Sequence, residues 1–136
     1  MIKLFMGKKG TGKTRKMIDM ANKSAGEAKG NIVFVGEGRR YIMELKHEVR
    51  FIDVKEFDLS ELNVFYGFLG GIVATNYDIE QIYIDGLMEI FGRNMSGIES
   101  FISNINKLSK KFSINFIMSM DGDPESVPTF LKEFVA

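Results

Sequence analysis

The chain has 136 residues, 18 basic and 18 acidic side chains, one histidine and no cysteine. This length predicts a single domain over residues 1–136, and a hydrophobic content of 45% predicts that it folds. The lack of cysteine excludes disulfide frameworks and thiolate metal sites, and one histidine cannot build a metal cluster alone.

The zero net charge conceals two unlike halves. Residues 1–50 carry 12 basic and 5 acidic side chains, a net charge of +7, whereas residues 51–136 carry 6 and 13, a net charge of −7. This asymmetry indicates an anionic ligand near the first half, although the neutral total does not indicate nucleic acid. The first apolar run is shorter than a signal-peptide core, and no stretch approaches the ~20 apolar residues of a membrane span. We therefore expect a soluble, cytoplasmic protein.

Five short apolar runs are typical of buried strands: residues 2–6, 31–35, 49–54, 81–85 and 114–120. They alternate with segments of helical period. This alternation predicts an α/β fold, with a mostly parallel sheet of about five strands and helices on both faces.

Two helices of clear pattern are predicted between the strands. The first covers residues 13–25, with Gly26 expected in the left-handed position that closes a helix. The second covers residues 94–112, where every third or fourth residue is apolar and forms one face. The residues of that face are Ile98, Phe101, Ile102, Ile105, Leu108 and Phe112.

A third helix, over residues 62–74, is apolar nearly all round, with Ser60 as its expected N-cap. Its glycines, Gly67, Gly70 and Gly71, require a reason such as close packing against another element. Burial in the core and a partner surface both remain open for this helix. A short closing helix is expected after Pro128.

Residues 7–14 read Gly-Lys-Lys-Gly-Thr-Gly-Lys-Thr and match the phosphate-loop motif G-x-x-x-x-G-K-[ST], directly after a strand and directly before a helix. The glycines allow backbone N–H groups to turn toward phosphate oxygens, and the helix points its positive end at the same place. Lys13 is expected to bridge the β- and γ-phosphates, and Thr14 to place its hydroxyl on Mg²⁺. The expected nucleotide-binding residues are Gly7, Lys8, Lys9, Gly10, Thr11, Gly12, Lys13, Thr14 and Arg15.

This loop, together with a later hydrophobic strand ending in Asp, resembles the P-loop NTPase superfamily with a RecA-like core over the whole chain. The chain is also similar to short bacterial ATP-binding proteins sometimes labelled twitching-motility ATPases. Pilus-retraction ATPases themselves are much longer and resemble it only around the phosphate loop. The resemblance implies a P-loop ATPase with ATP and Mg²⁺ as its ligands.

An acid that holds the magnesium shell is expected at the end of a buried strand beside the loop. Asp85 is the preferred residue, and Asp121 is the alternative because it also ends an apolar strand. The last strand of a RecA-like core usually ends in polar residues that sense the γ-phosphate, and Ser119 and Asp121 fit that role. Thr14 and Asp85 are therefore the expected metal-binding residues.

The group that orients the attacking water is less clear. Many ATPases of this superfamily have a Glu directly after the strand-end Asp, but here that position is Gly86. In RecA-like proteins the Glu follows the second strand, and this resemblance implies Glu37. Glu89 and Asp121 remain alternatives. The expected catalytic set is Lys13, Glu37 and Asp85.

Three arginines are candidates for contacting phosphate in their own or a neighbouring subunit: Arg39, Arg40 and Arg93. Solvated side chains are the alternative interpretation for all three. His47 lies in a charged stretch and is expected at the surface.

Three functions fit these residues: an ATPase that acts on an unknown partner, a nucleotide-dependent switch with little turnover, and a nucleoside-type kinase. The kinase is disfavoured because little chain after Asp85 is left for a lid. ATP is favoured over GTP because residues 119–122 lack the Asn and Lys with which GTPases read guanine. A homo-oligomer or a protein partner is a further possibility, by analogy with RecA-like cores that complete their nucleotide sites with a neighbouring subunit.

Overall fold

All five apolar runs form strands of one sheet. The computed structural model describes residues 1–39, 41–59, 61–87, 90 and 97–136. Its strands are β1 (Ile2–Gly7), β2 (Asn31–Gly36), β3 (Val49–Asp53), β4 (Ile79–Ile84) and β5 (Asn115–Asp121), each within two residues of the predicted run. They pair in parallel in the order β1-β5-β4-β2-β3. The predicted α/β fold with a parallel sheet is thus confirmed.

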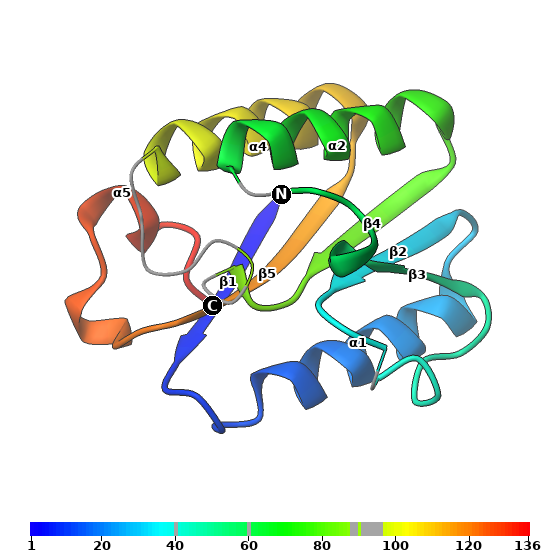
Figure 1. The fold of residues 1–136 in the computed structure, drawn as a ribbon, viewed down its shortest axis with the longest axis horizontal. Coiled ribbons are helices and arrows are strands. Elements are labelled where there is room, and N and C mark those ends of the chain that lie inside the picture. Colours follow the sequence, from blue (N-terminus) through cyan, green and yellow to red (C-terminus); the bar gives the residue numbers. More distant parts are fainter. Residues whose placement is uncertain (40, 60, 88–89, 91–96) are drawn as a thin grey trace.

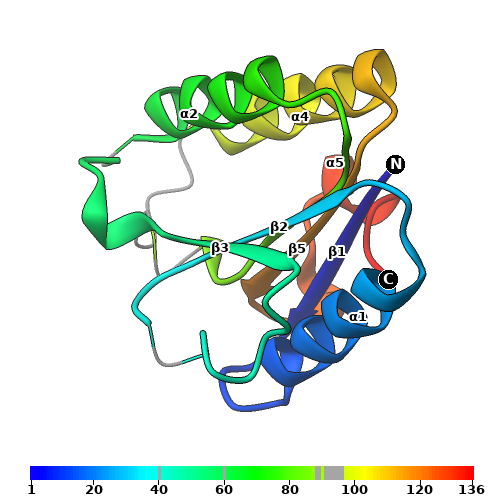
Figure 2. The same cartoon turned by 90° about the vertical axis from the view of Figure 1, so that its right-hand side faces the viewer.

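Helices cover both faces of this sheet. They are α1 (Lys13–Glu27), α2 (Leu62–Thr75), α4 (Ile98–Phe112) and the short α5 (Thr129–Lys132). Figure 1 shows α2 and α4 side by side on one face and α1 on the other, and the turned view in Figure 2 shows the same three layers. Among the described residues, no helix is long and apolar enough to cross a membrane.

Two hydrophobic clusters hold the layers together, because successive side chains of a strand point to opposite faces. On the α2 and α4 side, the rings of Phe65 and Phe101 stack with centroids 5.9 Å apart. On the α1 side, the rings of Phe34 and Tyr83 stack at 5.7 Å. The apolar face predicted for α4 is buried from Ile98 to Leu108, so this helix packs on the sheet as its pattern indicated.

The expectation that Gly26 closes the first helix in a left-handed conformation is wrong. Helix α1 continues through Gly26 to Glu27 and ends where Ala28 is extended and donates its N–H to Ser24. The glycine that the tertiary structure requires is Gly30, since a Cβ there would lie 2.1 Å from the carbonyl oxygen of Asp78. Close approach of the chain to the start of β4 therefore explains Gly30, whereas Gly26 is an ordinary helical residue.

The expectation that the glycines of α2 allow close packing against another element is also wrong for the residues that the structure describes. A Cβ added at Gly67, Gly70 or Gly71 would have no heavy atom of another described element within 4 Å. The helix instead buries its other side, with Phe65, Leu69 and Val73 inside the core. Ser60, the expected N-cap, lies outside the described residues.

The last residues cover the outer edge of β1. Leu4 donates its backbone N–H to Phe134, and Ala136 donates its N–H back to Leu4, so that Leu4 and Val135 form a parallel bridge. Leu131 of α5 is buried in the core beside them. The strand that carries the phosphate loop is thus held on both sides.

Candidate functional site

The site lies at the carboxyl edge of the sheet, where ligands of open parallel sheets bind. Strands β1 and β5 end together, with Gly7 opposite Asp121. Strand β4 ends one residue before Asp85, and β5 lies between β1 and β4. This order brings the phosphate loop, Asp85 and the end of β5 to one place.

The phosphate loop has the backbone conformation that only glycine adopts readily. Gly10 and Gly12 have φ angles of +84° and +85°. Gly12 stands at the N-cap of α1 and no side chain caps this end, while the first helical bond runs from the N–H of Lys16 to Gly12. The N–H groups of the first turn are therefore available to an anion.

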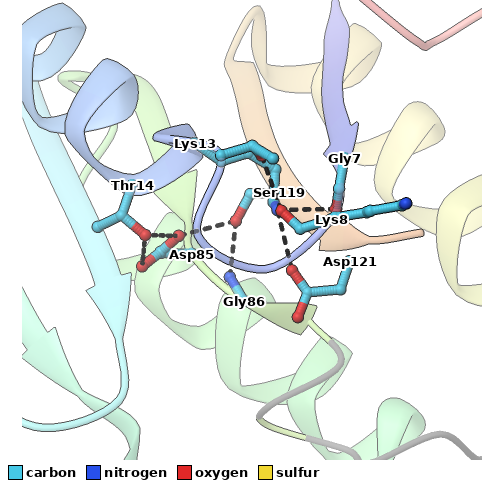
Figure 3. A network of polar contacts seen from close by, with 9 residues as sticks. Gly7, Lys8, Lys13, Thr14, Asp85, Gly86, Ser119 and Asp121 are labelled. Atoms are coloured by element: carbon cyan, nitrogen blue, oxygen red, sulfur yellow. Dashed lines mark hydrogen bonds and ion pairs between the residues drawn. The ribbon is translucent and has the colours of Figure 1, made fainter. Parts of the chain in front are cut away.

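Lys13 folds back over the loop instead of extending into solvent. Its ammonium donates to the backbone carbonyls of Gly7 at 2.8 Å and Lys8 at 2.9 Å. It also forms an ion pair of 2.9 Å with Asp121, and its side chain is only 12% exposed. Figure 3 shows these contacts from close by.

A second group of contacts joins α1, β4 and β5. The Thr14 hydroxyl lies 3.0 Å from both carboxylate oxygens of Asp85. The Ser119 hydroxyl donates to Asp85 at 2.8 Å and accepts the backbone N–H of Gly86 at 2.8 Å, as Figure 3 shows. Ser119 is 1% exposed, so the Asp85 carboxylate lies between the Thr14 hydroxyl and the buried hydroxyl of Ser119.

These groups line a cavity of about 390 Å³, within the usual range for small-molecule sites. Both carboxylates, Asp85 and Asp121, line it together with Lys13 and Thr14. Tyr41, from the loop after β2, also lines the cavity. The sequence pattern did not indicate Tyr41, because a lone aromatic residue in a loop carries no periodic signal.

The outer residues of the loop face solvent. Lys8, Lys9 and Thr11 are exposed, and the Thr11 hydroxyl donates to the carbonyl of Lys8 at 2.8 Å. Arg15 pairs with Glu44 at 2.6 Å, and that contact raises the pKa of its guanidinium above the usual value. Arg15 also lines the cavity, but its guanidinium is paired with Glu44.

Glu37 follows β2 as expected, but it does not line this cavity in the part of the chain that the structure describes. Its carboxylate lies 3.4 Å from the ammonium of Lys55, and its side chain is 30% exposed. Asp53 ties the same region together by accepting the N–H groups of Gly38 at 2.8 Å and Lys55 at 3.0 Å. Strand β3 holds Glu37 beside Lys55, and this pairing was not visible in the sequence.

The remaining candidates lie elsewhere. Arg39 pairs with Glu56 at 3.6 Å and lines a separate hollow of about 690 Å³ along β3. His47 is 95% exposed and contacts Glu48, as expected of a surface residue. Three candidates lie outside the described residues, namely Arg40, Glu89 and Arg93.

Comparisons with known proteins agree with this architecture. No family model matches the sequence, and no curated protein matches it significantly. A significant match among solved structures is the crystal structure of a KaiC-like protein from the hyperthermophilic archaeon Pyrococcus horikoshii OT3, with a TM-score of 0.66 and 17% identity. The match covers 96% of this chain and 65% of that chain, so this chain spans slightly less than two thirds of that protein's length. The chain therefore shares its fold, an all-parallel sheet of order β1-β5-β4-β2-β3 covered by helices, with this KaiC-like protein.

Proposed function

We propose that residues 1–136 form one nucleotide-binding domain that binds Mg²⁺–ATP at the phosphate loop and hydrolyses it to ADP and phosphate. The contact between Thr14 and Asp85 carries this proposal. It joins the first turn of α1 to the end of β4, next to a loop whose glycines and lysine suit phosphate. The likeness to the KaiC-like protein supports the fold that such a site needs.

The donor set of Thr14 and Asp85 fits Mg²⁺. Magnesium prefers oxygen ligands at 2.0–2.1 Å in octahedral geometry, where adjacent ligands lie about 2.9 Å apart. The hydroxyl oxygen of Thr14 and the carboxylate oxygens of Asp85 are 3.0 Å apart. Magnesium keeps several waters and takes phosphate oxygens, so one carboxylate and one hydroxyl suffice on the protein side. When bound, the ion neutralises charge on the transferring phosphate.

Backbone N–H groups of the loop, Lys13 and Glu37 have separate roles in the proposed hydrolysis. Backbone N–H groups around Gly10 and Gly12 orient the phosphates, and Lys13 stabilises the charge that develops as the bond between the β-phosphate oxygen and the γ-phosphorus breaks. Water supplies the new oxygen on phosphorus, and its proton goes to a carboxylate. Glu37 is the proposed acceptor, which requires that it leave Lys55.

A nucleotide-dependent switch with little turnover is the second candidate. Two observations favour it: the residue after Asp85 is glycine, and Glu37 pairs with Lys55 outside the cavity. In that case the bound nucleotide itself, and not its hydrolysis, is the signal.

One pair of measurements separates these functions. Calorimetric titration with Mg²⁺–ATP, Mg²⁺–ADP and Mg²⁺–GTP tests binding, and steady-state phosphate release tests turnover. Lys13→Ala is expected to lower ATP affinity at least tenfold, because it removes charge-assisted hydrogen bonds to phosphate. Lys23→Ala removes an exposed charge from the same helix and serves as the matched control.

The outcomes differ for each function. Tight ATP binding with phosphate release well above that of Lys13→Ala supports the ATPase. Tight ATP binding with phosphate release no higher than that of Lys13→Ala contradicts the ATPase function and supports the switch. Equal binding of ATP by wild type and Lys13→Ala contradicts both, and stronger binding of GTP than ATP contradicts the expected base preference.

Assembly with a protein partner or a second copy is a further part of this proposal, by analogy with RecA-like cores that complete their nucleotide sites with a neighbour. Light scattering after size-exclusion chromatography, with and without Mg²⁺ and a non-hydrolysable ATP analogue, measures it. A nucleotide-dependent increase in mass supports self-assembly, whereas an unchanged monomer mass contradicts it.

A further inference from the structure

The ammonium of Lys13 has a complete set of partners before any phosphate arrives. A lysine ammonium has three N–H donors. Lys13 has three acceptors within hydrogen-bonding distance, two being the loop carbonyls of Gly7 and Lys8 and the third a carboxylate oxygen of Asp121. Asp121 therefore occupies the one acceptor position at Lys13 that carries a negative charge, as a phosphate oxygen would.

The backbone of β5 keeps Asp121 in this place. Asp121 is paired with Gly7 in the register of β1 and β5, and the next N–H, from Gly122, donates to Gly7 at 3.1 Å. Only the two side-chain torsions of Asp121 are free to move its carboxylate. Among the described residues, Lys13 is the cation paired with Asp121, so no other positive group draws the carboxylate away. The backbone of Asp121 is therefore fixed beside the phosphate loop, next to the position where phosphates are proposed to bind.

We propose that Asp121 is a specificity-determining residue, which weakens binding of nucleoside triphosphates relative to nucleoside diphosphates. This inference rests on the proposed nucleotide site. The phosphate-loop lysine reaches the β- and γ-phosphates, so a triphosphate brings one more charged group to Lys13 than a diphosphate does. That added charge faces the Asp121 carboxylate. With a diphosphate, the ammonium of Lys13 keeps an N–H group for its ion pair with Asp121.

The size of this effect follows from distance. Two acceptors on one tetrahedral ammonium, each about 2.9 Å from nitrogen, lie about 4.7 Å apart. Repulsion between unit charges at that separation changes a binding constant about fourfold in water and several hundredfold at an effective dielectric constant of about 20. The Asp121 side chain is 36% exposed, so solvent screens much of the repulsion. We expect a change of about tenfold in the ratio of triphosphate to diphosphate affinity.

The test compares Asp121→Asn with Asp123→Asn. The first change keeps the size of the side chain and removes its charge. The control removes a charge two residues away, where the exposed Asp123 carboxylate accepts the N–H of Glu125 at 2.9 Å and has no contact with Lys13. Calorimetry on the full chain measures the affinity of each variant for Mg²⁺–ADP and for a non-hydrolysable Mg²⁺–ATP analogue, and thermal denaturation verifies folding.

The expected result is an affinity ratio, triphosphate over diphosphate, that rises about tenfold in Asp121→Asn and stays within twofold of wild type in Asp123→Asn. A ratio that stays unchanged or falls in Asp121→Asn overturns this inference and leaves the proposed site intact. If wild type binds neither nucleotide, the proposed function and this inference both fail. Asp121→Ser, which also removes the charge, repeats the test if Asp121→Asn does not fold.

Discussion

Ser119 offers a sharp test of how the site is held together, and the perturbation is Ser119→Ala. The buried hydroxyl donates to Asp85 and accepts from the Gly86 N–H, both at 2.8 Å. Alanine leaves the N–H of Gly86 without its partner and frees one oxygen of Asp85. The second effect acts directly on the carboxylate that also contacts Thr14.

The magnitude follows from these two contacts. An unsatisfied buried N–H costs about 1–3 kcal/mol, and a hydrogen bond to a charged group contributes about 1.5–3 kcal/mol. The contacts share one hydroxyl and are not additive, so we expect a loss of about 2 kcal/mol in the free energy of unfolding. For a domain of 136 residues this lowers Tm by roughly 5–10 °C. If Asp85 binds the metal as proposed, losing the group that orients its carboxylate is expected to weaken Mg²⁺-dependent nucleotide binding about 10–100-fold.

Ser109→Ala is the matched control for this experiment. Ser109 is also 1% exposed, and its hydroxyl donates to the carbonyl of Ile114, just before β5 begins and at the opposite edge of the sheet. Both variants should lose stability in thermal denaturation, but only Ser119→Ala should lose Mg²⁺-dependent ATP binding in calorimetry. If the two variants bind Mg²⁺–ATP within twofold of each other, Ser119 does not position Asp85 for the metal.

Three further predictions concern the fold. Gly30→Ala should destabilise the protein by about 1–3 kcal/mol, since its Cβ would lie 2.1 Å from the carbonyl oxygen of Asp78; an unchanged urea midpoint would show that this turn relaxes freely. Gly67→Ala and Gly71→Ala should each stabilise α2 by about 0.5–1 kcal/mol, because they face open space in a helix interior; a lower Tm would instead indicate that this face is covered. Burial raises the pKa of the Tyr83 phenol above its ordinary value of 10.0. The neutral phenol therefore stabilises the folded state fully below pH 10, and this contribution is lost as the pH rises through the raised pKa of the folded state. Chemical denaturation at pH 8 and pH 11 should therefore show a smaller alkaline loss of stability in Tyr83→Phe than in wild type, and equal losses would contradict this reasoning.

The phosphate loop was predictable because its determinants are local. Gly10 and Gly12 adopt backbone angles that other residues avoid, and Lys13 reaches carbonyls only five and six residues earlier in the chain. The strands were predictable for a related reason: in a parallel sheet covered on both faces, consecutive residues are all buried and read as continuous apolar runs. Strand β5 is an example, with five consecutive buried residues.

The contacts of the two strand-end aspartates were not predictable from their local sequences. Asp85 and Asp121 each follow an apolar run, and both patterns suit a metal-binding acid. The structure places Asp85 against Thr14 and Asp121 against Lys13. The difference arises because β5 pairs with both β1 and β4, so that its last residue lies beside Gly7. A local pattern carries no information about which strand lies next to which.

The sequence by itself determined that this chain forms an α/β fold with a phosphate loop between β1 and α1, because apolar runs, helical periods and glycine-dependent turns are encoded over a few neighbouring residues. Only the tertiary structure decided which distant groups meet: Asp121 at Lys13, Ser119 under Asp85, and Glu37 at Lys55. These contacts depend on strand order and on side-chain direction at the edge of the sheet. Both are set by packing of the whole chain, and they decide which charged groups lie beside the phosphate loop.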